Sequence, residues 1–183
     1  MDEARLEPVG NGVAAVTEGW FVVNAREAPW VERPGFGKRG RFELDGRLAA
    51  GTDFEPVHFP QLGICLAVLE PGEPNGYYHG EAGQEDFLVL SGECLAIVEE
   101  QELRLRQWDF LHCPPWTRHI MIGAGDGPCV ILMTGARVEG GIVYPVSEVA
   151  ARHGASAEAE TTSPREAYAH VPHWAPAEAK PEL

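Results

Sequence analysis

The chain has 183 residues, of which 44% are hydrophobic and 23% charged, as expected for one globular domain with flanking extensions. Its formal net charge is −14. This charge argues against nucleic acid or an anionic membrane as partner, because both are bound by basic surfaces. We therefore expect a small molecule or another protein as the partner.

The composition also bears on the compartment. No apolar run approaches the length of a membrane span, and the acidic start MDEARLEPVG lacks the apolar stretch of a secretion signal. The four cysteines show no C-x-x-C spacing, and three of them lie inside apolar runs. This pattern favours buried free thiols in a reducing environment over disulfides, so we expect a cytoplasmic protein.

Turn-forming residues dominate the chain before residue 62. The first fifteen residues have the character of a frayed end. Two strands are expected after them, at residues 20–24 (WFVVN) and 39–44 (RGRFEL). Together they would form an N-terminal strand extension over residues 18–60.

Strands separated by turns follow from residue 62. Residues 62–70 (LGICLAVLE) are almost continuously apolar between two prolines, which predicts a strand buried on both faces. Leu103 and Leu105 alternate with arginines, as in a half-buried strand. No segment with helical periodicity interrupts residues 62–135, so the core is predicted to be all-β, a sandwich or barrel. The other expected strands are 85–90, 94–99, 102–107, 110–115, 119–124 and 129–135.

Helical signals appear only near the C-terminus. Ser147 can cap a short helix that ends before Gly154, and Ser163 begins a capping box with Pro164 and Glu166. These segments predict a helical tail over residues 145–183. We expect its last residues, 173–183, to be loosely held.

A group of possible metal ligands lies between the first two core strands. His79 and Glu81 are two residues apart and would share one face of an extended segment. Residues 82–84 can turn the chain, so that Glu85 opens the returning strand beside them. Imidazole and carboxylate groups suit Fe, Mn, Ni or Zn. The alternative is a surface hairpin with solvated carboxylates.

The stretch HGEAGQEDFLVLSG, residues 79–92, resembles the first sequence motif of the cupin superfamily, G-x5-H-x-H-x3–4-E-x6-G. His79, Glu85 and Gly92 stand at the positions of the first histidine, the glutamate and the last glycine. Glu81 stands where the family has its second histidine. The spacings between these residues match the motif.

Residues 108–123 resemble the second cupin motif, G-x5-P-x-G-x2-H-x3-N, in a more degenerate form. Pro114 and His119 occupy the proline and histidine positions. The two glycines are replaced by Trp108 and Trp116, and the final asparagine is replaced by Gly123.

The resemblance implies a single domain over residues 1–183 with a motif-bearing core at about 62–137. Its fold would be an antiparallel jelly roll, or double-stranded β-helix barrel, with short C-terminal helices. The ligands of a divalent ion (Fe, Mn, Zn or Ni) would be His79, Glu81, Glu85 and His119. Glu81 would act either as a fourth ligand or as a general base, which makes it the candidate catalytic residue.

The resemblance leaves the function open between two classes. One is a small soluble metal-binding cupin that binds a small molecule in the barrel and transforms it by dioxygenase- or isomerase-like chemistry, as a metal-dependent oxidoreductase or isomerase. The other is a non-catalytic ligand-binding, sensor or assembly cupin without metal. We also expect a homodimer, formed through the N-terminal strands and an apolar edge at residues 62–70.

Two further residues receive a structural interpretation. His112 and Cys113 are adjacent, so only one of them can face the interior of the barrel. We interpret Cys113 as a core thiol rather than a ligand or redox group.

Overall fold

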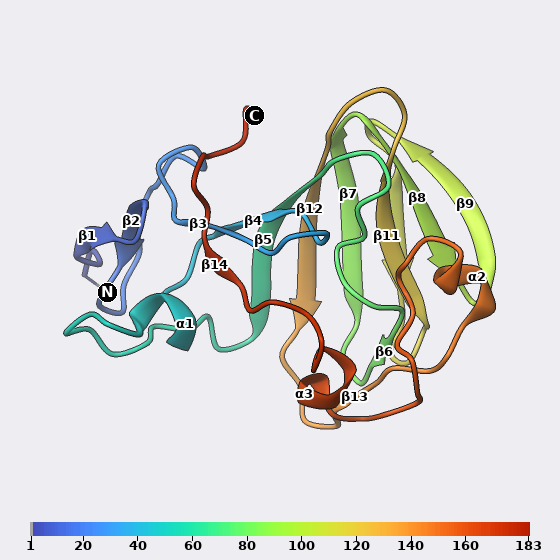
Figure 1. Ribbon diagram of the computed structural model, residues 1–183. Helices are drawn as coiled ribbons and strands as arrows, with labels where there is room; N and C mark the ends of the chain where they lie inside the picture. The colour runs from blue at the N-terminus through green and yellow to red at the C-terminus, as the bar shows by residue number, and fades with distance from the viewer. Residues whose placement is uncertain (1) are drawn as a thin grey trace.

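A computed structural model describes residues 2–183 and shows two large antiparallel sheets with smaller ribbons beside them (Figure 1). The strands of the larger sheet are β3 (Trp30–Glu32), β4 (Lys38–Arg41), β5 (Leu62–Leu69), β7 (Glu85–Ser91), β10 (Phe110–Cys113), β12 (Cys129–Ala136) and β14 (Ala175–Pro176). The second sheet contains β8 (Glu93–Val98), β9 (Gln101–Arg106) and β11 (His119–Ala124). The ribbons are β1 (Leu6–Val9) with β2 (Gly12–Ala15), and β6 (Gly80–Glu81) with β13 (Ile142–Val143).

The strand order of the larger sheet is β10-β7-β12-β5-β4-β3-β14, and that of the second is β11-β8-β9. Alternate residues of β5, β7 and β12 point toward the second sheet, because side chains alternate between the faces of a strand. The result is one apolar core between the sheets. Its buried members are Ala67, Leu69, Phe87, Val89, Cys94, Ala96, Cys113, Met121, Cys129 and Ile131. The prediction of an all-β antiparallel jelly roll is confirmed.

The thiol predictions are also confirmed. All four cysteines are buried and free, and Cys113 belongs to the core. The side chain of its neighbour His112 points outward and contacts the Asp86 carboxylate, with Nδ1 2.6 Å from Oδ1.

Each strand expected from residue 62 onward is present, but the role given to residues 62–70 needs a correction. β5 lies inside the larger sheet, hydrogen-bonded to β12 on one side and β4 on the other. Its residues 65–68 are therefore paired on both sides and offer no free edge to a second copy of the chain, whereas residues 62–64 have no partner in β4. The edges of this sheet are β10 and β14, and the homodimer itself stays a prediction.

The N-terminal region departs from the prediction in two ways. Residues 21–24 form no strand, and Trp20 makes only an isolated bridge with Glu3. Trp20 and Val22 are largely exposed, Phe21 and Val23 are half-buried, and no neighbouring strand pairs with residues 21–24. Of the first fifteen residues, residue 1 lies outside the described part of the chain, and residues 6–15 form the β1–β2 hairpin. In this hairpin Val9 and Ala14 pack in a second apolar cluster with Val31 of β3.

The described part of the chain contains three short helices: α1 (Gly46–Ala49), α2 (Glu148–Ala151) and α3 (Pro164–Ala167). The hydroxyls of Ser147 and Ser163 cap α2 and α3 as predicted, while α1, capped by Asp45, was not anticipated. No helix within residues 2–183 is long and apolar enough to cross a membrane.

The expectation of a loose C-terminal end is wrong at β14. This strand pairs with β3, and the Asn11 side-chain amide donates a hydrogen bond to the Ala177 carbonyl (2.9 Å). The two terminal regions of the chain thus lie side by side on the larger sheet (Figure 1).

The loop that precedes His79 packs directly on β11 at Gly123. The Gly123 amide donates to the Glu73 carbonyl (2.9 Å), and the Gly72 amide donates to the Gly123 carbonyl (2.8 Å). A Cβ atom added at Gly123 would lie 2.1 Å from the Glu70 carbonyl oxygen. A side chain at this position would therefore push the loop away from the strand.

We expect Gly123→Ala to lower the free energy of unfolding by about 1–3 kcal/mol, because the overpacked loop must shift. Gly127→Ala is the matched control, since open space surrounds that residue, and its effect should stay within about 0.5 kcal/mol. Denaturant titration of both variants measures the difference. Equal effects would contradict the importance of this close approach.

Candidate metal centre

The two histidines of the predicted site face each other across a backbone bridge. The His119 amide donates to the His79 carbonyl at 2.8 Å, and the His79 amide donates to the His119 carbonyl at 3.2 Å. Residues directly opposite in an antiparallel pair project their side chains to the same side. The ring centroids consequently lie 4.9 Å apart.

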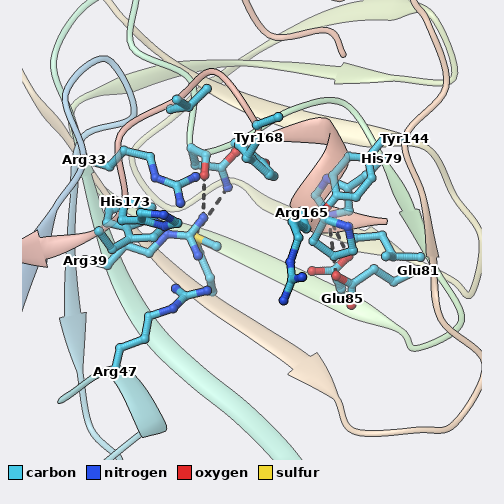
Figure 2. Close-up of a pocket in the computed structure, with 18 of the residues that line it drawn as sticks. Arg33, Arg39, Arg47, His79, Glu81, Glu85, Tyr144, Arg165, Tyr168 and His173 are labelled. Atoms are coloured by element: carbon cyan, nitrogen blue, oxygen red, sulfur yellow. Dashed lines mark hydrogen bonds and ion pairs between the residues drawn. The ribbon is translucent and has the colours of Figure 1, made fainter. Parts of the chain in front are cut away.

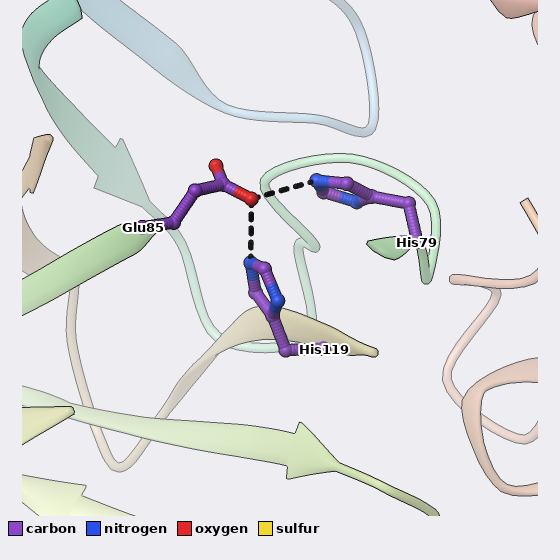
Figure 3. A group of neighbouring side chains, drawn as sticks. All are labelled: His79, Glu85 and His119. Atoms are coloured by element: carbon purple, nitrogen blue, oxygen red, sulfur yellow. Dashed lines mark ion pairs between the residues drawn. The ribbon is translucent and has the colours of Figure 1, made fainter. Parts of the chain in front are cut away.

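Glu85 completes the group from the first position of β7, where it is held between β10 and β12. Its Oε2 atom lies 3.6 Å from Nε2 of His79 and 3.3 Å from Nε2 of His119 (Figure 3). One donor atom from each of the three residues lies within 4.8 Å of the others. Three of the four predicted ligands are thus brought to one point.

Backbone carbonyls orient both imidazoles. Nδ1 of His79 lies 2.6 Å from the carbonyl of Tyr77, and Nδ1 of His119 lies 2.9 Å from the carbonyl of Thr117. A carbonyl oxygen only accepts, so Nδ1 must carry the proton in each ring. In the neutral rings both Nε2 lone pairs then face Glu85, which is the arrangement of metal-binding histidines.

The donor atoms at the centre of this group lack ordinary partners. Oε2 of Glu85 and Nε2 of His119 are fully buried and have no hydrogen-bond partner among the described residues. A buried polar atom without a partner costs about 1–3 kcal/mol. Two nitrogen lone pairs and a carboxylate oxygen directed at one point fit a divalent cation.

The charges of the group influence one another. Burial lowers the pKa of His119, and the nearby charge of His79 lowers it further. Burial also opposes the charged form of His79, but the Glu85 carboxylate outweighs it, so the pKa of His79 is raised. Burial would raise the pKa of Glu85, yet His79 and His119 together lower it. Glu85 is therefore ionised and His119 neutral around neutral pH.

Glu81, the fourth predicted ligand, lies beside this group rather than within it. Its Oε1 is 3.8 Å from Nε2 of His79, and its side chain is 38% exposed. β6 ends at Glu81, and the Trp116 amide donates to its carbonyl at 2.6 Å. Burial, together with the charge of Glu85, raises the pKa of the Glu81 carboxyl. Its role as ligand or base stays a prediction.

The candidate centre opens into a cavity of about 650 Å³ (Figure 2). His79, Glu81 and Glu85 lie at one end, and Phe87 and Tyr144 contribute to the wall. The size suits a small molecule. The remaining wall carries arginines that the sequence analysis did not identify as site residues: Arg33, Arg39, Arg47 and Arg165.

These arginines were missed because they belong to flanking segments that were interpreted as turns, as tail or, for Arg39, as an N-terminal strand outside the core. Their positions in the cavity depend on long-range pairing, such as that of β4 with β5. The only available signal was basic residues scattered through flanking segments of a strongly acidic chain.

Comparison with known proteins supports the fold. A family model described as a cupin domain matches residues 65–135. An RmlC-like cupin from Shewanella frigidimarina is 15% identical, with a TM-score of 0.51 and coverage of 66% of this chain and 94% of that one. At this identity the likeness shows the fold alone.

Two other solved structures are similar over shorter stretches. A protein named, provisionally, a sugar phosphate isomerase from Acidithiobacillus ferrooxidans is 25% identical, with a TM-score of 0.45 and coverage of 60% of this chain and 65% of its own. The chain thus spans just under two thirds of that protein. The DMSP lyase DddQ from Ruegeria pomeroyi is 23% identical, with a TM-score of 0.42 and coverage of 51% of this chain and 48% of its own. No curated protein sequence matches the chain.

The carbonyl contacts predict the tautomers of the two histidines. In metal-free protein at alkaline pH, we expect His79 and His119 to be neutral and protonated at Nδ1, because each Nδ1 faces an acceptor. Long-range ¹H–¹⁵N correlation spectra of the imidazoles report this directly, with the exposed His170 as the reference. Protonation of His119 at Nε2 would contradict the assignment.

Proposed function

Because the chain belongs to the cupin superfamily, we propose that it is a metal-dependent protein that binds a small molecule in the cavity of its jelly roll. His79, His119 and Glu85 would hold the divalent ion, which is Fe, Mn, Zn or Ni. The observation that carries this proposal is the convergence of two carbonyl-oriented Nε2 atoms on the buried Oε2 of Glu85.

Three protein ligands leave coordination positions open toward the cavity. A divalent ion supplies a Lewis acid that polarises an oxygen of a bound molecule. The ring of Phe87 packs edge-on against His119, with centroids 5.0 Å apart, and keeps water away from one side of the group. The open side therefore faces the cavity and its contents.

Side chains beside the candidate centre favour proton transfer, the isomerase-like alternative, as the chemistry. The Oε1 atom of Glu81 borders the cavity next to His79 and is placed to accept a proton from a bound molecule. The Tyr144 ring lies 5.8 Å from that of His79. Burial raises the pKa of the Tyr144 phenol, which stays protonated and can donate a hydrogen bond. The alternative, a non-catalytic binding protein, would bind the small molecule without changing it chemically.

The first test is metal content. Protein purified without added metal and then incubated with Fe, Mn, Zn or Ni should hold one ion per chain, measured by elemental analysis and calorimetry. We expect His119→Ala to lose the ion while circular dichroism shows the fold intact. His112→Ala is the matched control, because His112 lies on the outer face and pairs with Asp86. Wild-type protein that takes up no ion would contradict the proposal.

The second test separates the two glutamates. We expect Glu85→Gln to weaken metal affinity by more than about 100-fold, because it removes the charge of a ligand. Glu81→Gln should change the affinity by less than about tenfold, since Glu81 lies outside the three-residue group. Calorimetric titration with Zn or Ni measures both. Equal losses in the two variants would instead make Glu81 a fourth ligand.

A further inference from the structure

The cavity is lined by four arginines from segments that flank the motif-bearing core, and three of them lie at the end away from Glu85. Arg33 follows β3, Arg39 lies on β4, Arg47 is in α1 and Arg165 is in α3. Figure 2 shows Arg33, Arg39 and Arg47 on one side of the pocket and His79, Glu81 and Glu85 on the other. Positive charge is thus concentrated at one end of the space.

None of these arginines forms an ion pair within the described part of the chain. The exposed Arg26, Arg106 and Arg118 form none there either, but Arg33 is buried and Arg39 half-buried. The chain has 28 acidic and 14 basic residues, so carboxylates are plentiful. Arg41, Arg137 and Arg152, outside this cavity, each contact an Asp or Glu. Within residues 2–183, no carboxylate pairs with the four arginines of the cavity.

Aromatic rings and backbone hold the guanidinium groups instead. The Cζ atom of Arg33 lies 4.8 Å from the ring centre of Tyr168 and 5.0 Å from that of Trp174. The Cζ atom of Arg39 lies 4.8 Å from the ring centre of Trp174. The guanidinium of Arg39 also donates to the Asn75 carbonyl. Contacts of this kind fix the position of a cation without neutralising its charge.

Burial makes the missing counterion costly. Arg33 is only 8% exposed, and the Nε atoms of Arg33 and Arg39 are buried with no hydrogen-bond partner within the described chain. Burial lowers the pKa of both guanidinium groups, and a neighbouring arginine adds to the effect in each case. An uncompensated buried charge is strongly unfavourable, so an anion in the cavity would stabilise these two groups.

We propose that the cavity binds its small-molecule ligand through an oxyanion, a carboxylate or a phosphate, held by Arg33, Arg39, Arg47 and Arg165. Planar guanidinium groups match the geometry of both oxyanions, which they bind through paired hydrogen bonds. The inference rests on the proposed function in one respect, namely that the other end of the same ligand would reach His79 and Glu85.

The ligand must also be small. A net charge of −14 repels large polyanions, whereas the field of the arginines acts locally, over a screening distance of about 8–10 Å. The cavity of about 650 Å³ has room for a molecule of metabolite size.

Calorimetric titration with inorganic phosphate and with succinate distinguishes the two oxyanions. We expect one of them to bind with one site per chain, and the double variant Arg47→Gln/Arg165→Gln to weaken that binding by about tenfold or more. Both residues are exposed, so their replacement leaves the packing of the fold unchanged. The exposed Arg106, outside the cavity, provides the control variant Arg106→Gln, which should bind as the wild type does.

The metal-deficient variant His119→Ala separates this inference from the proposed function. Anion binding that persists in His119→Ala but weakens in the double arginine variant supports the arginine site, even if wild-type protein holds no metal. The inference is overturned if neither anion binds, if the double variant binds as tightly as the wild type, or if only His119→Ala loses binding.

Discussion

Two backbone hydrogen bonds between His79 and His119 join segments that are distant in sequence, and the candidate centre is organised around them. The bridge places the rings on one side, while the carbonyls of Tyr77 and Thr117 set their orientation. Glu85 is the first residue of β7, and the pairing of β7 with β12 places its side chain beside both imidazoles. Local backbone geometry, more than any attraction between the side chains, therefore brings the donor atoms together.

The core could be predicted from sequence because its signals are local. The alternation of leucine and arginine along β9 and the apolar run of β5 each arise within one segment. The spacing of His79, Glu81 and Glu85 likewise depends on one short turn. It placed His79 and Glu85 in the site, but it could not tell that the Glu81 side chain lies beside the group.

The flanking regions could not be predicted because their structure depends on distant partners. β1 and β2 are ordered through a cluster that includes Val31, and β14 exists only by pairing with β3. Residues 20–24 show the reverse case, because these strand-forming residues make only an isolated bridge at Trp20 and no strand. The arginines that line the cavity likewise come from segments distant in sequence, so no single motif identifies them.

The degenerate second motif has left-handed backbone at the two positions where the motif has glycine. Trp108 and Trp116 stand at the glycine positions and have φ angles of 75° and 67°, a left-handed conformation that costs an L-residue roughly 1–2 kcal/mol. Both side chains are at least half exposed. The left-handed positions in the segment that precedes His119 are therefore occupied by residues other than glycine.

The pairing of β14 with β3 also sets an order of assembly. The chain leaves the ribosome from its N-terminus, so all residues of the metal centre emerge before Arg165, Tyr168 and Trp174. The candidate centre can form on the nascent chain, whereas the arginine-lined part of the cavity is complete only after the last strand docks. Over evolutionary time the same separation lets changes in the two flanking segments alter the cavity wall while leaving the strands of His119 and Glu85 untouched.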